Sequence, residues 1–125
     1  MKKILIVDDE AELLTILEVA FRKSGFDVET ASDGLEGLAL ARTGQPDLIV
    51  LDLRLPGLDG HTICQMLKAD QAYRHIPILM LTASREQEDQ DWAVRTGADL
   101  YMTKPCHLQD LIETVTRLLA PPVAT

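Results

Sequence analysis

Five polar residues in this sequence stand at the ends of short apolar runs. Asp8 and Asp9 follow the first run, and Asp52 follows a later one. Thr82 and Lys104 stand at the ends of two further runs nearer the C-terminus. Clustered carboxylates favour a hard divalent cation, and a single carboxylate can attack a phosphoryl group. A lysine and a hydroxyl can then neutralise the phosphoryl oxygens. These residue types suit phosphoryl transfer to an aspartate, provided that the fold brings them together.

Short apolar runs alternate along the chain with longer segments whose apolar residues recur at helical spacing. The predicted strands are residues 3–7, 26–31, 47–51, 78–82 and 100–103. The predicted helices are residues 11–24, 33–42, 61–70, 84–97 and 108–119. Successive βα units are typical of a parallel sheet covered by helices on both faces. The expected fold class is therefore α/β, a doubly wound (βα)5 flavodoxin-like fold with strand order 2-1-3-4-5.

Apolar spacing predicts which side of each helix faces the core. The predicted inward residues are Leu13, Leu14, Leu17 and Phe21; Leu35, Leu38 and Ala39 or Leu40; Ile63, Met66 and Leu67; and Leu108, Leu111, Ile112, Val115, Leu118 and Leu119. The segment 84–97 differs, because its only apolar residues between the two arginines are Trp92, Ala93 and Val94. This helix should dock weakly, and Trp92 suits either the core or a partner-binding face.

The carboxyl ends of the strands are where a doubly wound sheet binds its ligands, at the point where strand order reverses. In the order 2-1-3-4-5 the first and third strands flank that point. Asp8, Asp9 and Asp52 should therefore share one crevice, where their mutual repulsion favours Mg²⁺ as cofactor. Asp52 is the candidate nucleophile, and Lys104 and Thr82 suit the phosphoryl oxygens. Glu10 and Asp59 are interpreted as local structure, the first opening a helix and the second belonging to a turn.

Composition narrows the class of protein. The chain has 125 residues, enough for one core, and a formal net charge of −8, which argues against direct binding of nucleic acid. Cys64 and Cys106 lack metal-ligand spacing, as expected for buried small side chains in a reducing compartment. The apolar run after Lys3 ends within a few residues, too soon for a signal peptide or a membrane span. We expect a cytoplasmic domain that does not insert into membranes.

Four motifs in this order resemble those of two-component response-regulator receiver domains of the CheY-like type. They are residues 4–10 (ILIVDDE), 52–60 (DLRLPGLDG), 81–83 (LTA) and 104–105 (KP). The resemblance implies that Asp52 is the phosphoacceptor, Asp9 a direct Mg²⁺ ligand and Asp8 a largely water-mediated one. It implies a further metal contact from the backbone carbonyl of Arg54.

The same resemblance implies roles in signalling. Thr82 would contact the phosphoryl group and reorient on activation, Lys104 would pair with a phosphoryl oxygen, and Tyr101 would be the aromatic switch on the fifth strand. The Lys104–Pro105 bond would be cis. Arg54 and Ser84 occupy variable positions that tune the lifetime of the phosphoryl group.

Receiver-like identity also implies partners. A sensor histidine kinase or a phosphotransfer protein would supply the phosphoryl group, and the chain would catalyse its own phosphorylation and dephosphorylation. Output would pass to a downstream protein or a fused effector domain, with a phosphorylation-dependent homodimer as a further option. Residues 1–120 are the expected domain, and residues 121–125 a tail or the start of a linker.

Three other functions stay open at this point. A haloacid-dehalogenase-like phosphatase has its second acid two residues after the nucleophile of strand one, whereas Asp9 directly follows Asp8. A flavodoxin-like flavin carrier needs a Ser-, Thr- or Gly-rich loop there. A non-phosphorylated interaction module on the same scaffold would lack an acid or the lysine, and this chain keeps them all.

Overall fold

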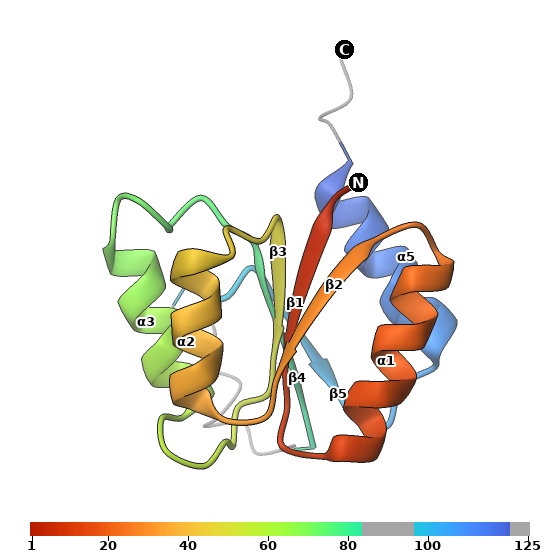
Figure 1. Ribbon diagram of the computed structural model, residues 1–125, viewed down its shortest axis with the longest axis horizontal. Helices are drawn as coiled ribbons and strands as arrows, with labels where there is room; N and C mark the ends of the chain where they lie inside the picture. The colour runs from red at the N-terminus through yellow and green to blue at the C-terminus, as the bar shows by residue number, and fades with distance from the viewer. Residues whose placement is uncertain (84–96, 121–125) are drawn as a thin grey trace.

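The strands form one five-stranded sheet in the computed structural model, which describes residues 1–83 and 97–120 (Figure 1). The strands are β1 (Lys3–Val7), β2 (Asp27–Ala31), β3 (Leu48–Leu51), β4 (Ile78–Thr82) and β5 (Leu100–Thr103). Every neighbouring pair is parallel, and the order is β2-β1-β3-β4-β5. The predicted fold class and strand order are therefore confirmed.

Helices cover both faces of the sheet in Figure 1, with α2 and α3 on one side and α1 and α5 on the other. Their bounds are α1 (Ala11–Lys23), α2 (Gly34–Thr43), α3 (Gly60–Ala69) and α5 (Leu108–Leu119). These bounds and those of the strands agree with the sequence prediction to within one residue. The helix predicted over residues 84–97, with Trp92, lies outside the described residues. Within the described part of the chain, no helix has the length and apolarity needed to span a membrane.

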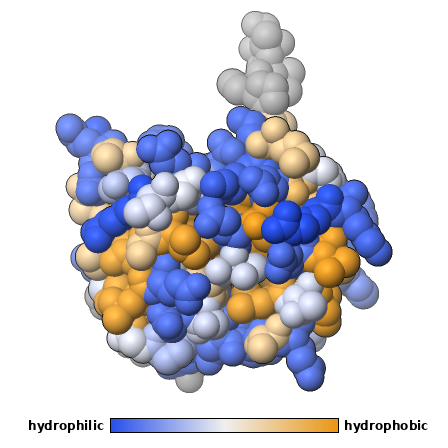
Figure 2. All heavy atoms as spheres, in the orientation of Figure 1, coloured by the Kyte–Doolittle hydropathy of each residue, from blue (hydrophilic) through white to orange (hydrophobic). Residues whose placement is uncertain are grey.

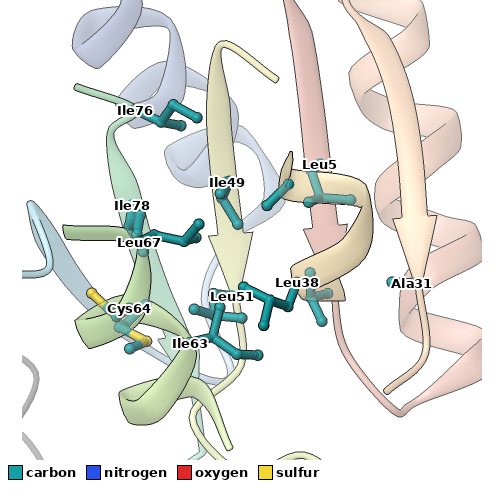
Figure 3. Packing of buried hydrophobic residues seen from close by; sticks show 13 residues of the cluster. Leu5, Ala31, Leu38, Ile49, Leu51, Ile63, Cys64, Leu67, Ile76 and Ile78 are labelled. Atoms are coloured by element: carbon teal, nitrogen blue, oxygen red, sulfur yellow. The ribbon is translucent and has the colours of Figure 1, made fainter. Parts of the chain in front are cut away.

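The sheet separates two hydrophobic clusters because successive side chains of a strand point to opposite faces. On β1, Leu5 and Val7 pack towards α2 and α3, in the cluster drawn in Figure 3. Ile4 and Ile6 pack towards α1 and α5 in the second cluster. The strands β1, β3 and β4 are almost completely buried. Each such leucine or isoleucine contributes about 1.5–3 kcal/mol to folding through burial.

The buried face of α2 corrects the sequence prediction. Leu38 is buried, and Leu40 packs half-buried against the same cluster, so Leu40 rather than Ala39 is the correct alternative. Leu35, in contrast, is 64% exposed. The buried stripe is Gly34, Gly37, Leu38 and Ala41. A Cβ on Gly34 would meet the carbonyl oxygen of Leu58, and one on Gly37 would meet the side chain of Val7. The two glycines therefore let α2 lie close to the loop that carries Leu58 and to β1, and Leu35 is on the exposed side of the helix.

Two further residues predicted to face the core are partly exposed. Met66 on α3 and Leu108 on α5 border the buried stripes rather than filling them. On α3 the stripe is formed by Gly60, Ile63, Cys64 and Leu67, so the expected burial of Cys64 is confirmed. On the face displayed in Figure 2, polar and charged side chains separate the exposed hydrophobic residues into several areas.

Tight local geometry joins β3 to α3. Asp59 caps α3 by accepting a hydrogen bond from the backbone N–H of Thr62, at 2.8 Å. The backbone N–H of Gly60 donates to the carbonyl of Leu53 at 2.8 Å. A Cβ on Gly60 would clash with the carbonyl oxygen of Asp52. Since the obstructing atom is backbone, only glycine allows this loop to close directly behind Asp52.

We expect Gly60→Ala to lower the free energy of unfolding by about 2–3 kcal/mol, because the strand-end backbone must shift to admit the methyl group. Urea denaturation of the variant and the parent measures this loss. Gly25→Ala is the matched control: its Cβ would meet open space, and only its positive φ opposes the change, so about 1 kcal/mol is expected. Parent-like stability of Gly60→Ala would mean that the loop has room at this position.

Candidate functional site

The predicted site residues are held at the carboxyl edge of the sheet by the backbone ladder itself. The N–H of Asp8 donates to the carbonyl of Ala31, and the N–H of Asp52 donates to the carbonyl of Val7. The N–H of Lys104 donates to the carbonyl of Thr82. Each residue thus extends the hydrogen bonding of its strand by one position. This fixes the backbone from which the three charged side chains project.

An ammonium group lies between the two buried carboxylates. Lys104 Nζ donates to Asp8 Oδ2 at 2.6 Å and to Asp52 Oδ2 at 3.3 Å. The side chains of Lys104, Asp8 and Asp52 are 13%, 3% and 8% exposed. Breaking an ion pair buried to this degree costs several kcal/mol, since the remaining charge stays away from water. Lys104 is therefore the main compensation for two buried negative charges.

A third carboxylate completes the cluster. Oxygen atoms of Asp8, Asp9 and Asp52 all lie within 4.8 Å of one another. Asp9 is exposed, and within the described residues it forms no ion pair with Lys104. The second oxygen of Asp8 accepts from the backbone N–H of Glu10 at 2.9 Å. The predicted convergence of the three acids is confirmed, and the cluster offers the oxygen ligands that Mg²⁺ prefers.

The burial and the ion pairs of this site shift the pKa values of Asp8 and Lys104. Burial raises the pKa of Asp8 above its ordinary value, although hydrogen bonds from Lys104 and from the N–H of Glu10 oppose the rise. Burial acts to lower the pKa of Lys104, but its hydrogen bond to Asp8 and the charge of Asp52 outweigh burial and raise that pKa. Lys104 is therefore charged throughout the physiological range.

The pocket at this edge is open, and most of the residues that line it carry a polar or charged group. Its lining comprises Asp9, Glu10, Asp52, Arg54, Thr82, Ala83 and Lys104. Thr82 is almost completely buried at the end of β4. The N–H of Arg54 lies 3.4 Å from Asp52 Oδ1, at the outer limit of a hydrogen bond. The structure therefore brings Thr82, Lys104 and Arg54 around one cavity with two members of the acidic cluster, Asp9 and Asp52.

Tyr101 lies apart from this pocket. It pairs with Met80 in the β4–β5 register and packs half-buried against the cluster beneath α2 and α3. The two-residue alternation of β4 assigns Thr82 to the same face as Met80. The two proposed switch residues therefore share one face of the sheet. The Lys104–Pro105 bond is cis, as the resemblance implied.

Glu10 is the site residue that the sequence interpretation missed. It does precede α1, but its side chain makes no capping hydrogen bond there. Instead Glu10 Oε1 accepts from Lys104 Nζ at 3.2 Å. One signal was present in the sequence: an N-cap favours Asp, Asn, Ser or Thr, and a glutamate at that position suggests another use.

The comparisons with known proteins agree with this geometry. Residues 4–116 match the family model of the response regulator receiver domain. The chain belongs to this family. Among similar receiver-containing proteins, the dual master transcriptional regulator RpaA of a Synechocystis strain is 43% identical over 95% of this chain. The alkaline phosphatase synthesis regulator PhoP of Bacillus subtilis is 48% identical over 94%. The chain spans about half the length of these curated relatives, 49% and 48%.

Solved receiver structures have the same fold. A CheY-like receiver domain protein from Methanospirillum hungatei is 30% identical with a TM-score of 0.89, covering 95% of this chain and 94% of the other. Chemotaxis response regulator CheY4 of Vibrio cholerae is 32% identical with a TM-score of 0.88, covering 95% and 99%. The shared fold therefore covers nearly the whole of this chain and of each solved receiver.

We expect Lys104→Met to destabilise the receiver by about 2–4 kcal/mol at pH 7, because two buried carboxylates lose their counter-charge. The loss should shrink near pH ~5. The sign follows from the raised pKa of Asp8: a carboxyl group whose pKa is higher in the folded state adds stability while protonated, and that stability is lost as the pH rises through the folded value. Removing Lys104 removes a hydrogen bond that lowers the pKa of Asp8, so the variant should gain more stability than the parent when Asp8 becomes protonated.

Denaturation curves of Lys104→Met and the parent at both pH values measure the effect. Lys68→Met is the matched control, because Lys68 is another largely buried lysine, bonded to Asp99 and to the carbonyls of Arg74 and Ile76. Its loss of stability should depend less on pH, since Asp99 is much more exposed than Asp8. Equal pH dependence of the two variants would contradict the compensation assigned to Lys104.

Proposed function

We propose that this receiver domain accepts a phosphoryl group on Asp52 in a Mg²⁺-dependent reaction and thereby changes the surface that it offers to a partner. The observation that carries the proposal is the arrangement of Asp52 beside Asp8, Asp9 and Lys104 at the open edge of the sheet. Membership of the receiver family supports it.

The side chains divide the chemistry between them. A carboxylate oxygen of Asp52 forms a bond to phosphorus as the bond to the donor's leaving group breaks, and the leaving group departs with the electron pair. Charge then lies on the phosphoryl oxygens. The Lys104 ammonium and the Thr82 hydroxyl border the same pocket and are suited to meet those oxygens.

The acidic cluster fits the cofactor that receiver domains generally use. Asp8, Asp9 and Asp52 supply carboxylate oxygens, and the backbone carbonyl of Arg54 is the further ligand that we assign. When bound, Mg²⁺ would neutralise part of the charge on the cluster and on the phosphoryl oxygens. Asp9, exposed at the rim, would be the most accessible ligand.

The output of the switch is assigned to Thr82 and Tyr101. A hydroxyl that contacts the phosphoryl group changes its position when that group is present, and Tyr101 packs on the same face of the sheet. Reorientation of Tyr101 would then alter the surface around β5. The fourth predicted helix belongs to this proposal as well, although it lies outside the described residues.

Partners follow from the same proposal. The phosphoryl donor is a sensor histidine kinase or a phosphotransfer protein, and the domain acts in the cytoplasm. RpaA and the mycobacterial MtrA regulators are described as DNA-binding. By that analogy the output target is a downstream protein or a fused effector domain after residue 120. A phosphorylation-dependent homodimer is a further form of output. The net charge of −8 does not favour direct nucleic-acid binding by the chain itself.

The alternative functions are not favoured. The family match covers most of the chain and supports neither a haloacid-dehalogenase-like phosphatase nor a flavin carrier. A non-phosphorylated interaction module would not need the clustered acids and the lysine, and these are together in the structure. The domain would act on its own aspartate rather than turn over external phosphoesters.

Incubation with a small phosphodonor and Mg²⁺ should raise the intact mass of the parent by one phosphoryl group. Asp52→Asn should show no such increase, since an amide oxygen is a much weaker nucleophile than a carboxylate. Asp59→Asn is the matched control, because it removes a nearby acid that caps α3 and lies outside the pocket lining. Labelling of Asp52→Asn at the parental rate would exclude Asp52 as the acceptor.

Asp9→Asn should raise the metal-free melting temperature by about 3–5 °C, as expected for roughly 1 kcal/mol of relieved repulsion. The substitution leaves the ion pairs of Lys104 with Asp8 and Asp52 in place, so little stability should be lost through them. Millimolar Mg²⁺ should stabilise the parent by mass action and leave Asp9→Asn unchanged. Melts in chelator and in Mg²⁺ test both statements. A parent indifferent to Mg²⁺ would argue against a shared metal site.

A further inference from the structure

Glu10 lies on the border between two surfaces. It lines the acidic pocket together with Asp52, and it also lines an apolar groove between α1 and α5 that includes Leu13, Ile16 and Leu108. Its side chain is 59% exposed, yet its carboxylate reaches the largely buried ammonium of Lys104 at 3.2 Å. The contact joins residues that are 94 positions apart in the chain.

The local helix makes no use of this carboxylate. Asp33 and Asp59 cap α2 and α3 through their side chains, as short acidic side chains do at N-caps. Glu10 occupies the equivalent position of α1 without a side-chain capping bond. The extra methylene that makes glutamate a poorer cap gives it the reach to meet Lys104. The side chain therefore serves the pocket rather than the helix.

Three carboxylates share the ammonium of Lys104 in the resting domain. It lies 2.6 Å from Asp8, 3.2 Å from Glu10 and 3.3 Å from Asp52. Stabilising a phosphoryl group on Asp52 requires the ammonium to move onto the phosphoryl oxygens. A carboxylate that holds the Lys104 ammonium in the resting domain must therefore lose part of this ion pair before transfer.

We propose that Glu10 is a positioning residue that restrains the Lys104 ammonium by sharing it with Asp8 and Asp52, and thereby slows phosphorylation of the resting domain. This inference rests on the proposed function. Asp8 shares the hold on Lys104, but it also belongs to the metal cluster, whereas Glu10 lies outside that cluster. Glu10 is thus a restraint that can be removed without removing a proposed ligand.

Three variants separate the ion pair from the general effect of charge. Glu10→Gln removes the negative charge. Glu10→Asp keeps the charge but shortens the side chain by about 1.5 Å, out of reach of Lys104. Glu12→Gln removes the same charge from an exposed position in the first turn of α1, outside the pocket lining. None of the three alters a residue assigned to the chemistry.

The rate of phosphoryl incorporation from a small phosphodonor at saturating Mg²⁺ is the principal measurement, followed by intact mass. Glu10→Gln and Glu10→Asp should both react about two- to fivefold faster than the parent, the range expected from an exposed ion pair. Glu12→Gln should react at the parental rate. The difference should narrow at high salt, because one partner is exposed to solvent.

A second measurement follows the Lys104 ammonium itself by ¹⁵N NMR without a phosphodonor. Its signal should shift in both Glu10 variants and stay in place in Glu12→Gln. Parental rates in Glu10→Gln, or acceleration in Glu10→Gln without acceleration in Glu10→Asp, would overturn the inference and leave the proposed function intact. A parent that takes up no phosphoryl group would instead refute the proposed function, and this inference with it.

Discussion

The register of the parallel ladder decides which side chains can meet at the carboxyl edge of the sheet. Val7 pairs with Leu51, so the next residues, Asp8 and Asp52, emerge side by side. Thr82 pairs with Thr103, so Lys104 emerges one position beyond Thr82. A slip of one residue in either pairing would send these side chains to the opposite face and separate the acids from the lysine. The tight cover of β3 by both clusters protects this register.

Charge is balanced in the resting site by a group to which the proposed reaction also gives a role. Lys104 compensates the burial of Asp8 and Asp52, so the folded state depends on it before any phosphoryl group arrives. In the proposed transfer, the same ammonium would also pair with the phosphoryl oxygens. On that proposal, Lys104 would link the stability of the domain to the phosphorylation state of Asp52.

Much of this arrangement could be predicted because it follows from backbone order. Apolar runs ending in Asp8, Asp52 and Lys104 identify strand ends, and parallel strands bring their carboxyl ends to one edge. The prediction for α2 was wrong at Leu35. Two of the four buried positions of this helix are Gly34 and Gly37, which carry no hydrophobic signal although they permit close approach. Glu10 was missed for another reason: its partner is distant in sequence, and only the length and direction of both side chains reveal the contact.

The sheet also separates the site residues into two groups that share parity with different hydrophobic clusters. By the alternation of their strands, Asp8, Asp52 and Lys104 share parity with the residues packed beneath α1 and α5. Thr82 and Tyr101 share parity with those beneath α2 and α3. The charged residues of the site and the two proposed switch residues therefore project from opposite faces of the sheet, although Thr82 lines the same pocket as Asp52 and Lys104. If the proposed roles hold, substitutions beneath α1 and α5 would act on the supports of the charged residues, and substitutions beneath α2 and α3 on the supports of the switch residues. Thr82 would then couple the two hydrophobic layers, because it shares parity with one and lines the pocket of the residues supported by the other.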